Sequence, residues 1–205
     1  TVYIEGDGTV AAPYLLNSYL AETLAGKADA LDAYTYQSTT TLDTGAVLKW
    51  DNPLANKDVS ATGWSVSMDI YNVAADTVNG YDALLTFYGK GDEKGGIYEG
   101  GAIHWNDCDG SWTDDITNLA TGAWTKVTVV FGSDGAVTRY MGTTAYTENV
   151  IGTGSTLAAN MAAAKYIAVG VGGIWDAGYV DKGAAVANIK VYATALTAAQ
   201  VAAIE

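Results

Sequence analysis

Apolar and polar residues alternate along several short stretches of this chain, and that alternation constrains the fold more than any other feature. Residues 64–71 read W-S-V-S-M-D-I-Y, in which every second residue from Trp64 is apolar. A period of two predicts a strand with one buried face. Such strands must cover their apolar faces, and a second sheet is the natural cover, so the pattern predicts an antiparallel two-sheet sandwich. Further strands are predicted at residues 83–88, 101–105, 124–131, 136–141, 166–171 and 187–192.

The stretch of residues 124–141 predicts a β-hairpin. Its two strand-like runs are separated by Gly-Ser-Asp-Gly at residues 132–135, a sequence that favours a tight turn. Alternation within these runs and their neighbours predicts which residues fill the core. The predicted core residues are Trp64, Val66, Val127, Val129, Phe131, Ile189 and Val191.

The C-terminal segment changes from a strand pattern to a helix pattern. Ile189 and Val191 share one face of a predicted strand, and the residues between and after them share the other. Thr197 and Gln200 then have the spacing of a capping box, in which each side chain accepts a backbone N–H of the first turn. The alanines that follow favour helix. A short helix is therefore predicted to close the chain.

Four segments resemble laminin-G-like (concanavalin-A-like) jelly-roll domains. They are G-W-S-V-S-M-D-I at 63–70, T-G-A-W-T-K-V-T-V-V-F at 121–131, Y-I-A-V-G at 166–170 and A-N-I-K-V-Y-A-T-A-L-T-A-A-Q-V at 187–201. The resemblance covers roughly residues 45–205 and matches residues 1–44 poorly. Within that N-terminal part, residues 15–31 are compatible with a short helix or with irregular edge structure.

The resemblance implies one all-β domain over residues 1–205, a two-sheet antiparallel sandwich of the concanavalin-A-like jelly-roll type with a short C-terminal helix. It also implies that Trp64 and Trp124 occupy core positions. Most bacterial domains that close in this way bind or cut carbohydrate, so a glycan or polysaccharide is the expected partner.

The net charge of the chain argues against nucleic acids and anionic membranes as partners. The formal net charge is −13 at pH 7, which repels the phosphates of nucleic acids and anionic lipids. No apolar run approaches the ~20 residues of a membrane span. The chain starts abruptly at Thr1 in a strand-like sequence. We expect a monomeric module of a longer bacterial polypeptide, secreted or on the cell surface, with other domains attached.

The glycosidase and lyase motifs of related sandwich enzymes are absent from the sequence. No two glutamates lie within five residues of each other, so a Glu-x-Asp-x-Glu strand motif cannot be formed. The chain has one histidine, His104, and one arginine, Arg139, far apart in sequence. Sialidase chemistry needs several arginines for the substrate carboxylate. We therefore expect no enzyme activity, although a non-standard aspartate pair in the cluster at residues 107–115 is left open.

Two segments combine tryptophans with hydrogen-bonding side chains and glycines, as carbohydrate sites do, because a sugar ring has apolar faces and polar edges. The first is residues 98–115 and the second is residues 172–181. Buried packing of the loops is the rival explanation for each tryptophan. The predicted ligand-binding residues are Trp105, Trp112, His104, Asn106, Asp107, Asp109, Trp175, Asp176 and Tyr179.

A structural calcium ion is the one cofactor for which the sequence offers a signal. Asp107-x-Asp109-Gly110 resembles part of an oxygen-ligand loop, and hard cations prefer carboxylate oxygens. The same sequence is also a plain turn, and both readings stay open.

Three functions are compatible with the sequence. The first is non-catalytic carbohydrate binding, which brings an attached secreted enzyme or surface protein to a polysaccharide or a host glycan. The second is an adhesive or structural spacer module that binds protein. The third is a glycosidase or lyase with a non-standard site.

Overall fold

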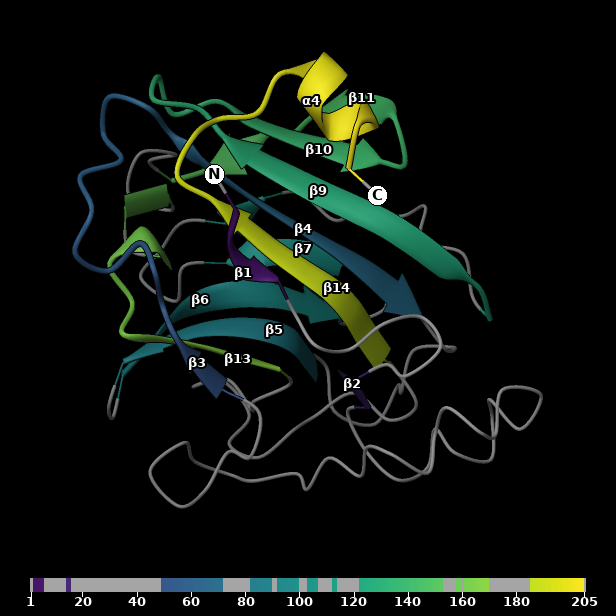
Figure 1. Cartoon of the computed structure of the whole chain (residues 1–205), viewed down its shortest axis with the longest axis horizontal. Helices are drawn as coiled ribbons and strands as arrows, with labels where there is room; N and C mark the ends of the chain where they lie inside the picture. Colours follow the sequence, from purple (N-terminus) through teal and green to yellow (C-terminus); the bar gives the residue numbers. More distant parts are fainter. Residues whose placement is uncertain are drawn as a thin grey trace.

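The computed structural model describes residues 2–5, 14–15, 49–71, 82–89, 92–99, 103–106, 112–113, 122–152, 158–159, 161–169 and 185–204. Its elements are strands with one short C-terminal helix (Figure 1). The strands are β1 (Val2–Glu5), β2 (Tyr14–Leu15), β3 (Lys49–Asp51), β4 (Trp64–Tyr71), β5 (Asp82–Gly89), β6 (Asp92–Glu99), β7 (Ile103–Asn106), β8 (Trp112–Thr113), β9 (Trp124–Phe131), β10 (Val137–Met141), β11 (Thr144–Thr147), β12 (Val150–Ile151), β13 (Tyr166–Val169) and β14 (Ala185–Tyr192), and the helix is α4 (Ala198–Ala202).

The strands form two antiparallel sheets. Within the described part of the chain, the first sheet has the order β1-β14-β4-β9-β10-β11, with β2 also paired to β14, and the second has the order β12-β8-β7-β6-β5-β13-β3. Figure 1 shows the two sheets as separate layers, with α4 beside the first. The predicted all-β sandwich with a short C-terminal helix is confirmed.

The core lies between the two sheets. On the first sheet, the residues that the alternation of β4 and β9 assigns to one face are buried, and Trp64 and Phe131 lie opposite each other in register. Phe87 of the second sheet meets Trp64 with a ring-centroid distance of 5.3 Å. All seven predicted core residues are buried in one cluster, together with Leu85, Phe87 and Ile167 of the second sheet.

The hairpin between β9 and β10 is confirmed, with Val137 opposite Phe131 and Met141 opposite Val127. Its turn is held by a hydrogen bond from the N–H of Gly132 to the carbonyl of Ala136, at 2.8 Å. Gly135 has a φ of 85°, which a glycine adopts without the strain that a Cβ atom would add. The glycine at this position therefore allows the tight turn.

Strand β14 contains a β-bulge that the sequence pattern did not predict. The register with β4 shifts between Ala187 and Lys190, so that one extra residue is inserted in β14. Asn188 has a φ of 52° at this point, a conformation that asparagine tolerates better than most residues. The bulge lets Val186 and Ile189 both lie in the core, although they are three residues apart.

Helix α4 begins with the predicted capping box. The side chain of Thr197 accepts the N–H of Gln200, and the side chain of Gln200 accepts the N–H of Thr197. Val201 and Leu196 pack against Val130 and Tyr140, which lie on the outer face of the first sheet. The helix therefore covers part of that face.

Other predictions had mixed outcomes. Strands β2, β3, β6, β8, β11 and β12 were not predicted, because β6 is rich in charged residues and glycine and the other five are short. Leu15 belongs to β2, and the rest of the predicted 15–31 segment lies outside the described residues. In the part of the chain that the structure describes, no helix has the length and apolar character needed to cross a membrane.

Candidate functional site

Four of the predicted ligand-binding residues lie on two neighbouring strands of the second sheet. His104, Trp105 and Asn106 belong to β7, and Trp112 belongs to β8. Asn106 pairs directly with Trp112. The register thus brings the Trp112 position beside the end of β7, although five residues separate the two in sequence.

The pairing assigns these positions to the two faces of the sheet. The Trp105 position is opposite Ile97, which is opposite Leu85, a core residue. On β8, Thr113 is buried and pairs with Val150, which packs against the core. Positions 105 and 113 therefore share the inner face.

The outer face carries the remaining positions. Trp112 pairs with Ile151, a large apolar residue that is 38% exposed. Asn106 pairs directly with Trp112, so both positions lie on this face. His104 is two residues before Asn106 on the same strand, and it lies on this face as well because strand positions alternate between faces. We call positions 104, 106, 112 and 151 the outer corner of the second sheet. The outer corner therefore contains a histidine, an asparagine, a tryptophan and an isoleucine position.

The other predicted site residues lie outside the described residues. They include both aspartates of the predicted calcium loop, so that prediction stays a prediction. Among the residues that the structure does describe, no group of three or more histidine, cysteine, aspartate or glutamate side chains is arranged to hold a metal ion. The residues outside the description are Asp107, Asp109, Trp175, Asp176 and Tyr179.

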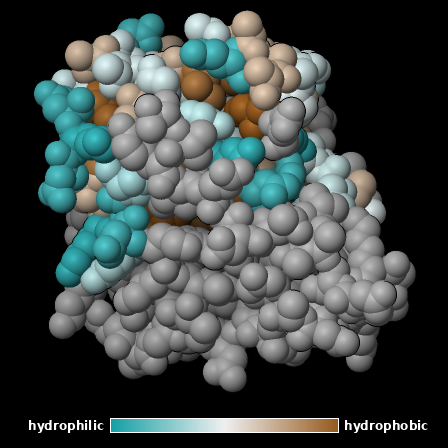
Figure 2. Space-filling model, viewed as in Figure 1, coloured by the Kyte–Doolittle hydropathy of each residue, from teal (hydrophilic) through white to brown (hydrophobic). Residues whose placement is uncertain are grey.

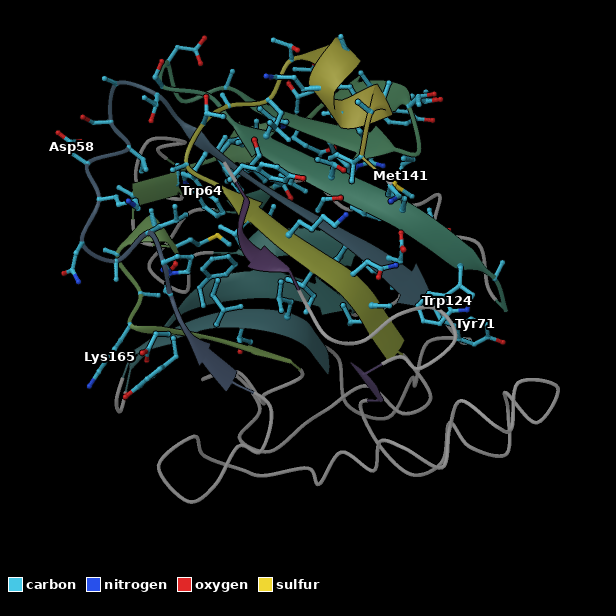
Figure 3. All side chains as sticks on the ribbon, viewed as in Figure 1. Asp58, Trp64, Tyr71, Trp124, Met141 and Lys165 are labelled. Carbon is cyan, nitrogen blue, oxygen red and sulfur yellow. The ribbon has the colours of Figure 1, made fainter. Side chains whose placement is uncertain are left out.

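Trp64 and Trp124 differ in a way that the resemblance did not imply. Trp64 is 1% exposed and belongs to the core. Trp124 pairs with Tyr71 on the outer face of the first sheet, at the opposite end of β4 and β9, and is only half-buried (Figure 3). The two rings lie with centroids 5.6 Å apart. The expected core position of Trp124 is wrong, because the alternation that buries Val127 and Val129 puts residue 124 on the other face.

A polar cluster next to this aromatic pair escaped the sequence analysis. Asp69 accepts a hydrogen bond of 2.7 Å from the side-chain amide of Asn188, and Lys126 lies 3.8 Å from the same carboxylate. Asp69 is 8% exposed. Asn188 reaches Asp69 from the bulge of β14, and a bulge leaves no signal in a simple alternating pattern.

The single arginine of the chain lies inside the sandwich. Arg139 is opposite Val129 on the inner face of the first sheet and is 6% exposed. Its Nε donates to Oε1 of Glu148 at 2.7 Å, and its guanidinium carbon is 4.5 Å from the ring centroid of Tyr146. Among the residues that the structure describes, none makes a hydrogen bond with the buried Nη1 atom of Arg139. This arginine is therefore engaged by the protein itself.

The comparisons with known proteins bear on the fold. A comparison with protein-family models finds no match, and neither does a comparison with curated proteins. Among solved structures, the chain is similar to NanB in a structure with Optactamide, at 14% identity and a TM-score of 0.53, over 83% of this chain and 27% of that chain. This similarity agrees with the two-sheet sandwich and shows the fold alone.

Two further solved structures are similar over 70% of this chain. One is domain 4 of AbnA, a GH43 extracellular arabinanase from Geobacillus stearothermophilus, in complex with arabinotriose, at 22% identity and a TM-score of 0.44, with 66% of that domain covered. The other is a mutant Trypanosoma rangeli sialidase with trans-sialidase activity, at 14% identity and a TM-score of 0.46. The chain spans 22% of that sialidase chain.

Proposed function

We propose that this chain binds carbohydrate without cleaving it, and that the outer corner of the second sheet is the binding surface. The observation that carries the proposal is the pairing of β7 with β8, which brings positions 104, 106 and 112 onto one face. Tryptophan offers an apolar platform for a sugar ring, and asparagine and histidine offer hydrogen bonds to its hydroxyl groups.

The resemblance of residues 187–201 to the closing segment of laminin-G-like domains supports the same function. In such a module, binding raises the local concentration of an attached domain at its polysaccharide substrate. We extend the proposal accordingly to a monomeric unit of a longer secreted or surface polypeptide.

The position of Arg139 supports the non-catalytic part of the proposal. Sialidases and uronate lyases need cationic side chains at the substrate carboxylate. The one arginine here is buried against Glu148 and is thus withdrawn from any surface site. Lysines could replace it only as flexible point charges, which lack the planar fork that binds a carboxylate through two N–H groups.

The experiment is a glycan array with the folded chain, followed by calorimetric titration of the best ligand. Trp112→Ala is expected to weaken binding by about tenfold, equivalent to 1.4 kcal/mol, while the melting temperature changes little. Asn106→Ala should weaken binding in the same direction. Trp124→Ala is the matched control, because it removes a tryptophan from the other sheet, and its glycan affinity should stay at the wild-type value.

Three results would contradict the proposal. The first is the absence of binding to any glycan on the array, with binding to a protein ligand instead, which would favour an adhesive or spacer module. The second is a Trp112→Ala variant that binds as tightly as the wild type. The third is measurable turnover of a polysaccharide that a single Asp→Asn change abolishes.

A further inference from the structure

One end of the sandwich carries an open pocket of about 330 Å³. Three segments that are distant in sequence enclose it: the loop between β3 and β4, the turn between β9 and β10, and the residues before β13. Its lining consists of Leu54, Ala55, Lys57, Asp58, Val59, Ser60, Gly63, Trp64, Phe131, Gly132, Ser133, Gly135, Ala158, Ala159, Ala162 and Ala163. Small-molecule pockets typically span about 300–1,000 Å³, so this one is large enough for a single ring.

The floor of the pocket lies against two aromatic core residues. Trp64 and Phe131 stack with ring centroids 4.2 Å apart and an angle of 20° between their planes. The indole N–H of Trp64 donates to the carbonyl of Ala158 at 3.1 Å. The side chains of Trp64 and Phe131 are 1% and 0% exposed, so they close the pocket from below, and the apolar contact for a ligand comes from the methyl groups of the walls.

The walls keep the space open. Ala158, Ala159, Ala162 and Ala163 present only methyl groups, so these four side chains are too short to reach across the pocket. The segment is fixed by Asn52, whose buried side-chain amide donates to the carbonyls of Ala162 and Ala164 at 3.1 and 2.8 Å.

The opposite wall is held just as firmly. Gly63 has a φ of +64°, and a Cβ atom there would lie 2.3 Å from the carbonyl oxygen of Phe131. Only glycine allows that close approach of the two backbones. The pocket is therefore a defined concavity between segments that are fixed in place.

The rim is polar and balanced in charge. Lys57 and Asp58 supply one positive and one negative group, and Ser60 and Ser133 supply hydroxyls. The side chain and the N–H of Ser60 both donate to the Asp58 carboxylate, at 2.5 and 3.0 Å. These hydrogen bonds, the side-chain one foremost, hold the pKa of Asp58 below its ordinary value, so the group is ionised at neutral pH. Figure 2 shows the hydrophilic margin along this loop, and Figure 3 shows Asp58 on it.

We propose that this pocket binds one terminal residue of an uncharged glycan. Methyl walls suit the apolar face of a sugar ring, and a rim of carboxylate, ammonium and hydroxyl groups suits its hydroxyls. A rim with one charge of each sign, on a chain with a net charge of −13, disfavours an anionic sugar. The floor closes the pocket at Trp64 and Phe131, which favours a chain end over an internal residue.

This site is separate from the outer corner of the second sheet, and it does not depend on the function proposed there. The lining residues and the outer-corner residues have no member in common. Each site can therefore be tested by variants that leave the other unchanged.

The test is an NMR titration of the ¹⁵N-labelled chain with methyl glycosides of glucose, galactose, mannose and N-acetylglucosamine. Glucuronic acid is the anionic comparator, and N-acetyl-leucinamide represents an apolar protein side chain. The signals to follow are the indole N–H of Trp64 and the amides of Ser133 and Gly135. At least one neutral glycoside is expected to shift these signals in a saturable way and to bind more tightly than both comparators.

Two variants test the location. Ala159→Trp places a large ring in the pocket from an exposed position and should weaken binding by at least about tenfold. Ala202→Trp, also at an exposed helical alanine, is the matched control and should bind as the wild type does. Asp58→Asn keeps the shape of the rim and should weaken binding as well, which provides a second test if Ala159→Trp disturbs the fold. Trp112→Ala should leave this binding unchanged.

The proposal is overturned if no neutral glycoside shifts the three signals. It is also overturned if N-acetyl-leucinamide or glucuronic acid binds at least as tightly as the neutral glycosides. Unchanged binding in both Ala159→Trp and Asp58→Asn would contradict the location. Loss of binding in Trp112→Ala, with Ala159→Trp unaffected, would assign the binding to the outer corner alone.

Discussion

Replacing Glu148 by glutamine should destabilise the fold strongly. The change keeps the shape of the side chain but removes its charge, which leaves the guanidinium of Arg139 without a counter-ion. The two side chains are 7% and 5% exposed, and their closest N–O distance is 2.7 Å. Water can therefore reach the unpaired charge of Arg139 only if the structure opens.

Breaking a buried ion pair by removing one partner costs about 3–5 kcal/mol. For a domain of about 150–250 residues, 1 kcal/mol lowers the melting temperature by roughly 2–4 °C. Glu148→Gln should thus lower the melting temperature by about 6–20 °C. The assay is urea unfolding followed by tryptophan fluorescence, with calorimetry for the melting temperature.

Two controls sharpen the result. Asp51→Asn neutralises an exposed carboxylate and should change stability by no more than about 0.5 kcal/mol. The double replacement of Arg139 by methionine and Glu148 by leucine removes both charges and should recover much of the loss, because apolar substitutes for buried pairs are often neutral or better. A loss below about 1 kcal/mol for Glu148→Gln would refute the reasoning, since it would mean that water solvates the pair.

The remaining predictions concern the core, the pocket wall, the helix cap and one carboxylate. Phe131→Ala should cost about 3–5 kcal/mol in urea unfolding, because Phe131 is fully buried, and a loss below about 1 kcal/mol would contradict its place in the core. Asn52→Ala should cost about 1–3 kcal/mol, because it leaves buried carbonyls of residues 162 and 164 unpaired; an unchanged midpoint would show that water replaces the amide. Thr197→Ala removes the helix cap and should cost about 0.5–2 kcal/mol, with Thr143→Ala, at an exposed turn residue, as the neutral control. In an NMR titration, Ser60→Ala should raise the pKa of Asp58 toward its ordinary value, because the side-chain hydroxyl of Ser60 donates to the ionised form. The hydrogen bond thus stabilises the fold above the ordinary pKa of Asp58, and that contribution is lost as the pH falls through the lowered pKa. An unchanged pKa in Ser60→Ala would show that the hydroxyl does not set it.

The parts of the fold that depend on local sequence were predictable. Strand β4 alternates from its first residue to its last, and its two faces follow directly from that period. The capping box of Thr197 and Gln200 needs only four consecutive residues, so its signal is complete in the sequence.

Features that depend on pairing between distant strands were harder to predict. The resemblance to laminin-G-like domains implied a core position for Trp124, yet its register with Tyr71 puts it on the outer face. The outer corner illustrates a partial success, since the sequence marked His104, Asn106 and Trp112 but could not say which of their neighbours share a face. The pairing of β8 with both β7 and β12 supplies that information.

The end pocket left no signal in the sequence. Its walls are alanines, which in a sequence indicate helix propensity and no site. The concavity arises only when three segments meet around the Trp64 and Phe131 rings. A pocket that forms because its wall residues have short side chains is visible only in three dimensions.

The bulge at Asn188 determines how strand β14 aligns with the sequences of relatives. Without the extra residue, either Val186 or Ile189 would leave the core, so a one-residue deletion there would turn the inward residues of half the strand outward. An alignment with a relative whose strand is regular must therefore carry a gap at position 188. Ungapped scoring across β14 would match inward residues on one side of the bulge and outward residues on the other.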